Sequence, residues 1–230
     1  VKVAGPASKA LGAFFTPTPL VRTLAEQSLN RVDLKSKRIH VFDPACGSGE
    51  FLREAVRQLA LRGYKGQVKV TGYDISPPAC LMARFGLAAE AATFGGSLTI
   101  NIEHRDALDG QEWVSGVDVC LMNPPFVAWV DMTASQRETV SRVLGETHVK
   151  RPDMASAFVR LAVGSLSQSA VIGAVLPASF LDGNSSARLR EFLLQGTTVE
   201  LSARLGNQAV FMDVTVDPAL LILKRHASGP

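Results

Sequence analysis

The feature that most constrains this chain is a series of four apolar runs, each of which ends in a polar residue. Short apolar runs bounded by polar residues are typical of buried strands. The first three polar ends lie about 30 residues apart, which is the length of one βαβ unit. This spacing predicts parallel strands joined by helices in a doubly wound α/β sheet. The runs are 38–42 before Asp43, 68–73 before Asp74, 98–104 before Asp106 and 117–122 before Asn123.

Helix starts and ends are marked by capping residues. Ser76 and Thr18 each precede a proline, and a hydroxyl residue followed by proline is favoured where a helix begins. Gly63 is placed to end the helix that starts near Gly49. These signals predict one helix ahead of the first strand and one helix in each of the first two crossovers.

Beyond Asn123 the chain becomes more polar, and 127–152 is expected to form a loop with a short helix over 135–144. The last two strands are separated by too few residues for a parallel crossover, so they should pair antiparallel. The fold class is therefore α/β, with a mostly parallel seven-stranded sheet and a C-terminal antiparallel hairpin. The remaining elements are helices over 154–166 and 186–194 and strands over 170–176, 199–205 and 214–224.

Length and composition indicate one folded domain. The chain has 230 residues, of which 47% are hydrophobic and 20% charged, which suits a single domain over 1–230 with a doubly wound core over 31–230. No apolar run reaches the roughly 20 residues that span a bilayer, and no leader peptide is visible at Val1. We expect a cytoplasmic protein with no membrane partner.

The three cysteines and the net charge add weaker expectations. Cys46, Cys80 and Cys120 lie too far apart in sequence to suggest a disulfide framework or a metal cluster, so we expect reduced thiols and no metal. The net charge of +3 is compatible with nucleic-acid binding without establishing it.

The polar strand ends predict where a ligand binds. In an open parallel sheet, ligands bind outside the carboxyl ends of the strands, so Asp43, Asp74, Asp106 and Asn123 should line one cleft. Asp74, at the end of the second strand, is suited to accept hydrogen bonds from ribose hydroxyls.

A glycine turn follows the first strand over 43–51. Gly47 and Gly49 allow a sharp bend and a close approach of the backbone to a ligand, and the helix amides behind them can receive an anion. Leu52 occupies the place of the third glycine in the dinucleotide fingerprint, which argues against a nicotinamide-dependent dehydrogenase. A nucleoside cofactor with a charged amino-acid tail fits this turn and Asp74 better.

The sharpest signal is the tetrapeptide Asn123-Pro124-Pro125-Phe126. Two prolines fix the backbone and remove two amide donors, which leaves carbonyl groups free to accept. The Asn123 oxygen and the Pro124 carbonyl can then accept hydrogen bonds from the two protons of one NH2 group. Phe126 offers a stacking surface for a planar base. Accepting these protons localises the nitrogen lone pair for attack on a methyl group, without a metal.

With these motifs the sequence resembles the adenine-specific DNA methyltransferases of the gamma arrangement. That family includes the modification subunits of type I systems and many fused restriction–modification enzymes. Residues 12–17 resemble the N-terminal cofactor motif within an N-terminal segment 1–30, and 43–51 and 123–126 resemble the glycine loop and the catalytic motif. The weaker later motifs match over 153–165, 170–180 and 209–224, and the order of the blocks is itself characteristic of the class.

The resemblance implies S-adenosylmethionine as cofactor, in a Rossmann-like methyltransferase fold. Phe15, Thr16 and Asp43 would line the methionine end, Asp74 would hold the ribose, and Ile75 would pack on the cofactor's adenine. Asp106 would meet the adenine amino group. The implied cofactor site is completed by Pro17, Ala45, Gly47 and Ala107.

The resemblance also implies the substrate, which is an adenine flipped out of double-stranded DNA and methylated at N6. Asn123, Pro124, Pro125 and Phe126 would be catalytic, with the base held between Phe126 and Phe211. The family more often has tyrosine where this chain has Phe126, a change that keeps stacking and removes one hydroxyl.

Members of this class carry a target-recognition region after the catalytic domain, whereas this chain ends at Pro230. We therefore expect sequence readout to come from a recognition domain or specificity subunit outside this chain, within a restriction–modification or related defence system.

Two alternatives remain open at this point. The same chemistry serves methylation of a protein glutamine or of an exocyclic amine in RNA, although residues 12–17 argue against both. An inactive methyltransferase fold serving as an assembly subunit is the other, although intact Asn123, Asp43 and Asp74 argue against it.

Overall fold

A computed structural model describes residues 16–205 and 217–225. It contains a seven-stranded sheet with the order β3-β2-β1-β4-β5-β7-β6. Strands β1 to β5 are parallel, and β7 runs antiparallel to both of its neighbours, β5 and β6. The predicted fold class is confirmed. The strands are β1 (Arg38–Asp43), β2 (Gln67–Asp74), β3 (Ser97–His104), β4 (Val119–Met122), β5 (Val171–Pro177), β6 (Thr197–Arg204) and β7 (Pro218–Arg225).

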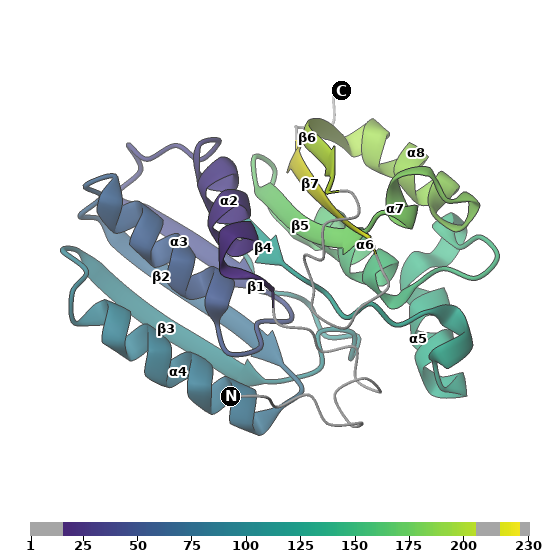
Figure 1. Ribbon diagram of the computed structural model, residues 1–230, viewed down its shortest axis with the longest axis horizontal. Helices are drawn as coiled ribbons and strands as arrows, with labels where there is room; N and C mark the ends of the chain where they lie inside the picture. The colour runs from purple at the N-terminus through teal and green to yellow at the C-terminus, as the bar shows by residue number, and fades with distance from the viewer. Residues whose placement is uncertain (1–15, 206–216, 226–230) are drawn as a thin grey trace.

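Helices cover both faces of the sheet (Figure 1). One face carries α2 (Thr18–Leu29), α3 (Glu50–Leu61) and α4 (Pro77–Ala91), and the other carries α6 (Met154–Ser165) and α8 (Ala187–Gly196). Helix α5 (Ala134–Leu144) packs on α6, and the short α7 (Ser179–Asp182) follows β5. Three single-turn 3-10 helices lie at Trp129–Asp131, Gly145–Thr147 and Asn184–Ser186.

The sheet separates two hydrophobic cores. Leu24, Leu52 and Val41 belong to the core on the α2–α4 side, whereas Phe42 and Phe158 belong to the core on the α6 side. Neighbouring residues of β1 thus point to opposite faces, as the pleat of a strand requires. Because both faces are covered, every residue of β1 after Arg38 is buried, including the polar His40.

The two predicted hydroxyl caps turn out differently. Ser76 is the N-cap of α4, where its side chain accepts from the Ala79 amide, so that prediction is confirmed. The prediction that Thr18 caps the first helix is wrong, because the amides of Leu20 and Val21 donate to the Pro17 carbonyl. That pairing starts α2 at Thr18, one residue earlier than a Thr18 cap requires.

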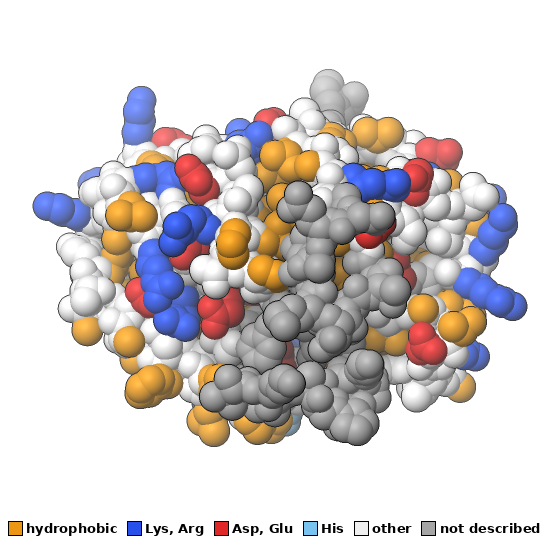
Figure 2. All heavy atoms as spheres, viewed as in Figure 1, with side chains coloured by type: hydrophobic (Ala, Val, Ile, Leu, Met, Phe, Trp, Pro, Cys, Tyr) orange, Lys and Arg blue, Asp and Glu red, His pale blue; other side chains and the backbone are white. Residues whose placement is uncertain are grey.

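The outer face of α4 is apolar. Leu81, Met82 and Phe85 are 62%, 57% and 81% exposed, and hydrophobic side chains gather over α4 at the lower left of Figure 2. No helix in 16–205 is long and apolar enough to cross a membrane.

Candidate active site

The predicted site residues converge because β2, β1 and β4 are parallel neighbours. Their carboxyl ends lie at one edge of the sheet, which brings together Asp43 at the end of β1, Asp74 at the end of β2 and Asn123 just after β4. This edge is where an open parallel sheet binds ligands.

The glycine turn is fastened to β2 by its backbone. The Cys46 amide donates to the Tyr73 carbonyl at 2.8 Å, and the Gly47 amide donates to Asp74 Oδ2 at 2.8 Å. Asp43 Oδ1 accepts from the Ala45 amide at 3.0 Å, which shapes the start of the turn. The turn therefore has a defined conformation before any ligand binds.

The two glycines of the turn serve different purposes. Both have positive φ, +52° at Gly47 and +84° at Gly49, which side chains strain. A Cβ on Gly49 would lie 3.1 Å from the Cβ of Ala83, so Gly49 allows α3 to approach α4 closely. A Cβ on Gly47 would meet no atom of the described residues within 4 Å. Gly47 therefore presents bare backbone to open space.

Asp74 retains capacity for a ligand. Its Oδ2 accepts from Gly47 and its Oδ1 accepts from the Ser76 amide at 2.8 Å. A carboxylate has about four acceptor positions, so about two remain for hydroxyl groups. Ile75, the next residue, is 52% exposed and offers an apolar surface beside the carboxylate.

Asp43 is 1% exposed, and no basic side chain of the described residues forms an ion pair with it. Burial raises its pKa to about 8, a rise that Asp74 reinforces and the hydrogen bond from Ala45 partly offsets. A buried carboxyl of this kind is suited to pair with a cationic group of a ligand, which would favour its ionised form.

The nearby cysteine is not a candidate nucleophile. Burial raises the pKa of the Cys46 thiol far above its usual value, and Asp43 and Asp74 raise it further. The thiolate is the nucleophilic form, so Cys46 serves packing instead.

The connection after β3 supplies the outer residues of the predicted site. Asp106 is exposed, and its Oδ1 accepts from the Leu108 amide at 2.8 Å. Ala107 is buried, and its carbonyl accepts from Trp113 Nε1 at 2.8 Å. The Arg105 amide donates to the Asp74 carbonyl, which holds the start of this connection beside the end of β2.

Asn123 has one satisfied and one unsatisfied end. Its Nδ2 donates to Thr16 Oγ1 at 2.8 Å, whereas its buried Oδ1 has no hydrogen-bond partner among the described residues. Nor does any group of the described residues donate to the carbonyl of Pro124. Buried polar atoms without partners are uncommon and costly, so this acceptor at a ligand-binding edge is available to a donor group of a ligand.

The segment after Asn123 is held from two sides. Phe126 is partly buried and packs against both hydrophobic cores, next to Pro125. The Val127 carbonyl accepts from the Met154 amide at 3.0 Å, in the first turn of α6. Asp153 caps that helix through its Oδ1, which accepts from the Ser156 amide at 2.8 Å.

Sequence reasoning did not identify two of these contacts. The pairing of Thr16 with Asn123 joins residues 107 positions apart, and no local pattern indicates it. The support of Val127 by α6 had a partial signal, because Asp153 is a favoured N-cap residue directly before an apolar run. Two predicted residues, Phe15 and Phe211, lie outside the described residues.

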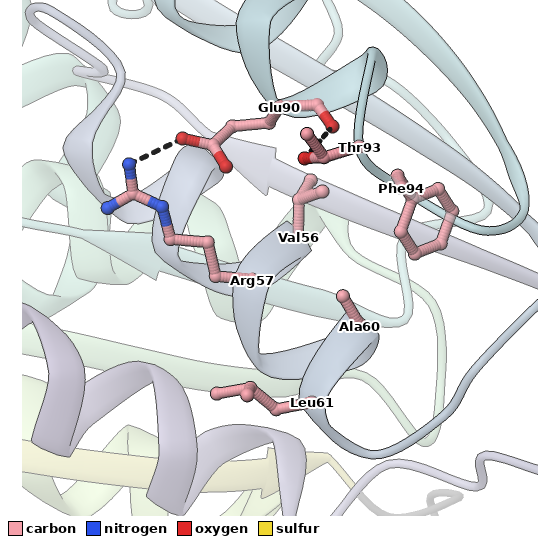
Figure 3. Close-up of a pocket in the computed structure, with 7 residues that line it drawn as sticks. All are labelled: Val56, Arg57, Ala60, Leu61, Glu90, Thr93 and Phe94. Atoms are coloured by element: carbon pink, nitrogen blue, oxygen red, sulfur yellow. Dashed lines mark hydrogen bonds and ion pairs between the residues drawn. The ribbon is translucent and has the colours of Figure 1, made fainter.

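A cavity of about 390 Å³ lies elsewhere, between α3 and α4 (Figure 3). The Arg57 and Glu90 side chains form an ion pair at its rim, and Phe94 lies at its far side. Its lining comes from the later turns of both helices and the loop before β3, so it lies apart from the carboxyl edge that carries Asp43 and Asn123. Within the described ranges, no three His, Cys, Asp or Glu residues group as a metal site would require.

Comparisons with known proteins identify the family of the chain. The model of the N-6 DNA methylase family matches residues 2–229. The type II methyltransferase M.BanIII of Aneurinibacillus aneurinilyticus is 24% identical over 96% of this chain and 40% of its own length. The MpnII methylase subunit of a Mycoplasma pneumoniae type I restriction enzyme is 25% identical over 96% of this chain and 41% of its own.

A solved structure shows the same fold. The methyltransferase subunit of a Streptococcus thermophilus type I restriction–modification system superposes with a TM-score of 0.68 at 21% identity. The match covers 99% of this chain and 52% of that subunit. The chain spans about 40% of the length of the two curated relatives.

Proposed function

Because the chain belongs to the N-6 DNA methylase family, we propose that it transfers a methyl group from S-adenosylmethionine to the N6 amino group of adenine in DNA. The observation that carries the proposal is the buried Asn123 Oδ1, an acceptor without a partner among the described residues at the ligand-binding edge of the sheet. An exocyclic amine supplies the donor that this oxygen lacks.

The residues present fit the cofactor. Asp74 has acceptor capacity for the two ribose hydroxyls, and Gly47 gives open backbone beside it. Asp43 would pair with the ammonium group of the methionine end, and Ile75 would pack on the adenine ring. Thr16, Pro17, Ala45, Asp106 and Ala107 complete the proposed cofactor site. When bound, the cofactor would supply a methyl group on a sulfonium, and the neutral thioether of S-adenosylhomocysteine would be the leaving group.

The chain's own contribution to transfer is hydrogen bonding to the target amine. The lone pair of an amine on an aromatic ring is delocalised into the ring. Asn123 Oδ1 and the Pro124 carbonyl would each accept a hydrogen bond from the amine. These two hydrogen bonds would favour a tetrahedral nitrogen with a localised lone pair. After transfer the nitrogen loses one proton to water. Pro125 and the hydrogen bond between Val127 and Met154 keep these acceptors in position.

The target base must leave the duplex to reach this edge. The NH2 group of a paired adenine lies inside the stack, so enzymes that modify bases flip them out. Phe126 would stack on one face of the flipped adenine, and Phe211 is the candidate for the other. Stacking on an aromatic side chain contributes about 1–3 kcal/mol per base.

The proposed partners are double-stranded DNA and a recognition domain or specificity subunit outside this chain. The two curated relatives are named a type II methyltransferase and a methylase subunit of a type I restriction enzyme, and this chain corresponds to about 40% of their length. We therefore propose a modification role in a restriction–modification or related system, in the cytoplasm where the DNA lies.

Methylation of a protein glutamine or of an RNA amine is the alternative that keeps the chemistry. The test incubates the gene product that contains this chain with methyl-labelled S-adenosylmethionine and, separately, unmethylated DNA, RNA and cell protein. Mass spectrometry then identifies the modified nucleoside or amino acid. The proposal predicts N6-methyladenine in DNA. Label only in RNA or protein, or N4-methylcytosine in DNA, would contradict it.

A further inference from the structure

The hydrogen bond between Asn123 and Thr16 links two functional segments. Thr16 lies just before α2, and Asn123 follows β4, so the 2.8 Å contact crosses from the N-terminal segment to the catalytic loop. In this contact Thr16 Oγ1 is the acceptor and Asn123 Nδ2 is the donor. That arrangement leaves Asn123 Oδ1 as the end of the amide without a partner among the described residues.

The Thr16 hydroxyl has a proton left over. A hydroxyl carries one donor and two acceptor positions, and here one acceptor position is used. No acceptor for the Thr16 proton is found among the described residues. A hydroxyl with a free proton can also donate to an amide oxygen. The hydroxyl alone therefore does not determine whether the oxygen or the nitrogen of Asn123 faces it.

The orientation of that amide matters for the reaction. With Oδ1 turned away from Thr16, Asn123 offers an acceptor to the incoming amine. With Nδ2 turned away, two donor groups would face each other and the acceptor would be lost. Only the first orientation supports activation of the amine.

We propose that Thr16 is a positioning residue that couples cofactor occupancy to the orientation of the Asn123 amide. This inference rests on the proposed function, in which Thr16 lies at the methionine end of the cofactor. Once the Thr16 hydroxyl donates a hydrogen bond to the cofactor's carboxylate, Oγ1 can only accept a hydrogen bond from Asn123. The amide must then present Nδ2 to Thr16 and Oδ1 to the substrate. The bound methyl donor thus holds the amide in the orientation that the ligand-free structure shows, and excludes the reversed one.

The kinetic test compares Thr16→Val, which removes the hydroxyl at nearly constant shape, with Thr16→Ser, which keeps it. Thr18→Val is the matched control, because Thr18 is exposed at the start of α2 and the side-chain hydrogen bond of Asn123 goes to Thr16 instead. At saturating cofactor we expect Thr16→Val to lower kcat about ten- to a hundred-fold, with a smaller change in KM for DNA. Thr18→Val should stay close to wild type, and Thr16→Ser should keep a higher kcat than Thr16→Val because it keeps the hydroxyl. An unchanged kcat in Thr16→Val would overturn the proposal.

A second readout is independent of activity. In nitrogen-15 NMR spectra, the side-chain amide signals of Asn123 are those that vanish in Asn123→Asp. We expect saturating S-adenosylhomocysteine to slow solvent exchange of these protons in wild type and in Thr16→Ser, but not in Thr16→Val. An equal slowing in Thr16→Val, or no slowing in wild type, would overturn the coupling.

The two proposals fail in distinguishable ways. A wild-type protein that slows Asn123 exchange on binding S-adenosylhomocysteine but labels RNA or protein instead of DNA would overturn the proposed substrate and support the coupling. A wild-type protein that methylates DNA while Thr16→Val keeps full kcat would support the proposed substrate and overturn the coupling.

Discussion

Asp43 illustrates how a single buried side chain ties stability to ligand binding. A carboxyl group that is 1% exposed with a pKa of about 8 is largely protonated in the empty protein at neutral pH. Ionisation in that place is unfavourable until a cation pairs with it. The ionised form of Asp43 is therefore favoured when a cationic ligand group pairs with it and destabilises the protein without that ligand.

This arrangement predicts a pH dependence of stability. Because the pKa of Asp43 is raised on folding, its contribution is fully present below the unfolded pKa near 4 and is lost as pH rises through about 8. We expect the unfolding free energy of the ligand-free chain to fall between pH 5 and pH 8, by up to about 1.4 kcal/mol per pH unit from this group. Urea denaturation across this range measures it.

The control is Asp43→Asn, whose Oδ1 can still accept from the Ala45 amide. Without an ionisable group at 43, its stability should vary less with pH over the same range. Equal slopes for the variant and the wild type would show that Asp43 does not titrate in this window.

At the residue scale, the sequence identified which site residues lie at the strand ends but not which of them form hydrogen bonds with each other. The strand-end positions of Asp43, Asp74 and Asn123 follow from the apolar runs that precede them. The contact between Thr16 and Asn123, and the choice of which amide end stays free, depend on how α2 packs. No local pattern encodes such a long-range contact.

At the element scale, the turn between β1 and α3 combines a strand, a glycine loop and a helix start. Its conformation is set from β2, through the hydrogen bonds that Cys46 and Gly47 donate. Gly49 fixes the distance between α3 and α4, whereas Gly47 faces the proposed cofactor. One loop therefore carries a glycine required for packing and a glycine that we propose binds the cofactor.

Substitution by alanine should separate these roles. Gly49→Ala combines a positive φ with a 3.2 Å approach to the Ala83 Cα, and we expect it to cost about 2 kcal/mol or more of unfolding free energy. Gly47→Ala has the backbone cost alone, about 1–2 kcal/mol, and should weaken S-adenosylmethionine binding more than Gly49→Ala does. Urea denaturation and calorimetric titration measure the two effects. A Gly47→Ala variant with wild-type cofactor affinity would contradict the assignment of Gly47.

Element prediction from sequence succeeded where the local signal was strong. Ser76 capped α4 as expected, but Thr18 did not cap α2, because the Pro17 carbonyl already accepts the first helical amides. The apolar residues of α4 are also a poor guide to burial, because Leu81, Met82 and Phe85 are exposed. Hydrophobicity alone does not distinguish a core face from an outward one.

At the scale of the whole molecule, strand order places the chemistry. With β1 between β2 and β4, the carboxyl ends that carry Asp74, Asp43 and Asn123 become neighbours. The antiparallel pairing of the last two strands was predicted from the few residues between the strands expected over 199–205 and 214–224. The insertion of β7 between β5 and β6 was not, because strand order depends on which faces pack together rather than on any local pattern.

The charge of the molecule sets an expectation for DNA binding. A net charge of +3 provides little of the phosphate neutralisation on which affinity depends, and many arginines are already paired with carboxylates. We expect the 230-residue chain by itself to bind duplex DNA with a Kd of about 10⁻⁶ M or weaker and with little sequence preference. A fluorescence-anisotropy titration at physiological salt measures this. Nanomolar, sequence-selective binding would place target recognition within these residues.

The central claim is that Asn123 activates an adenine amine by accepting a hydrogen bond from it. The most direct measurement is single-turnover methyl transfer to DNA by Asn123→Ala and by wild type, both saturated with S-adenosylmethionine, with cofactor affinity measured in parallel. The account predicts a loss of about a hundred- to a thousand-fold in the transfer rate. Cofactor affinity should change little, because in the proposed site Asp43, Asp74 and the glycine turn hold the cofactor. A wild-type rate of N6-adenine methylation in Asn123→Ala would contradict the account.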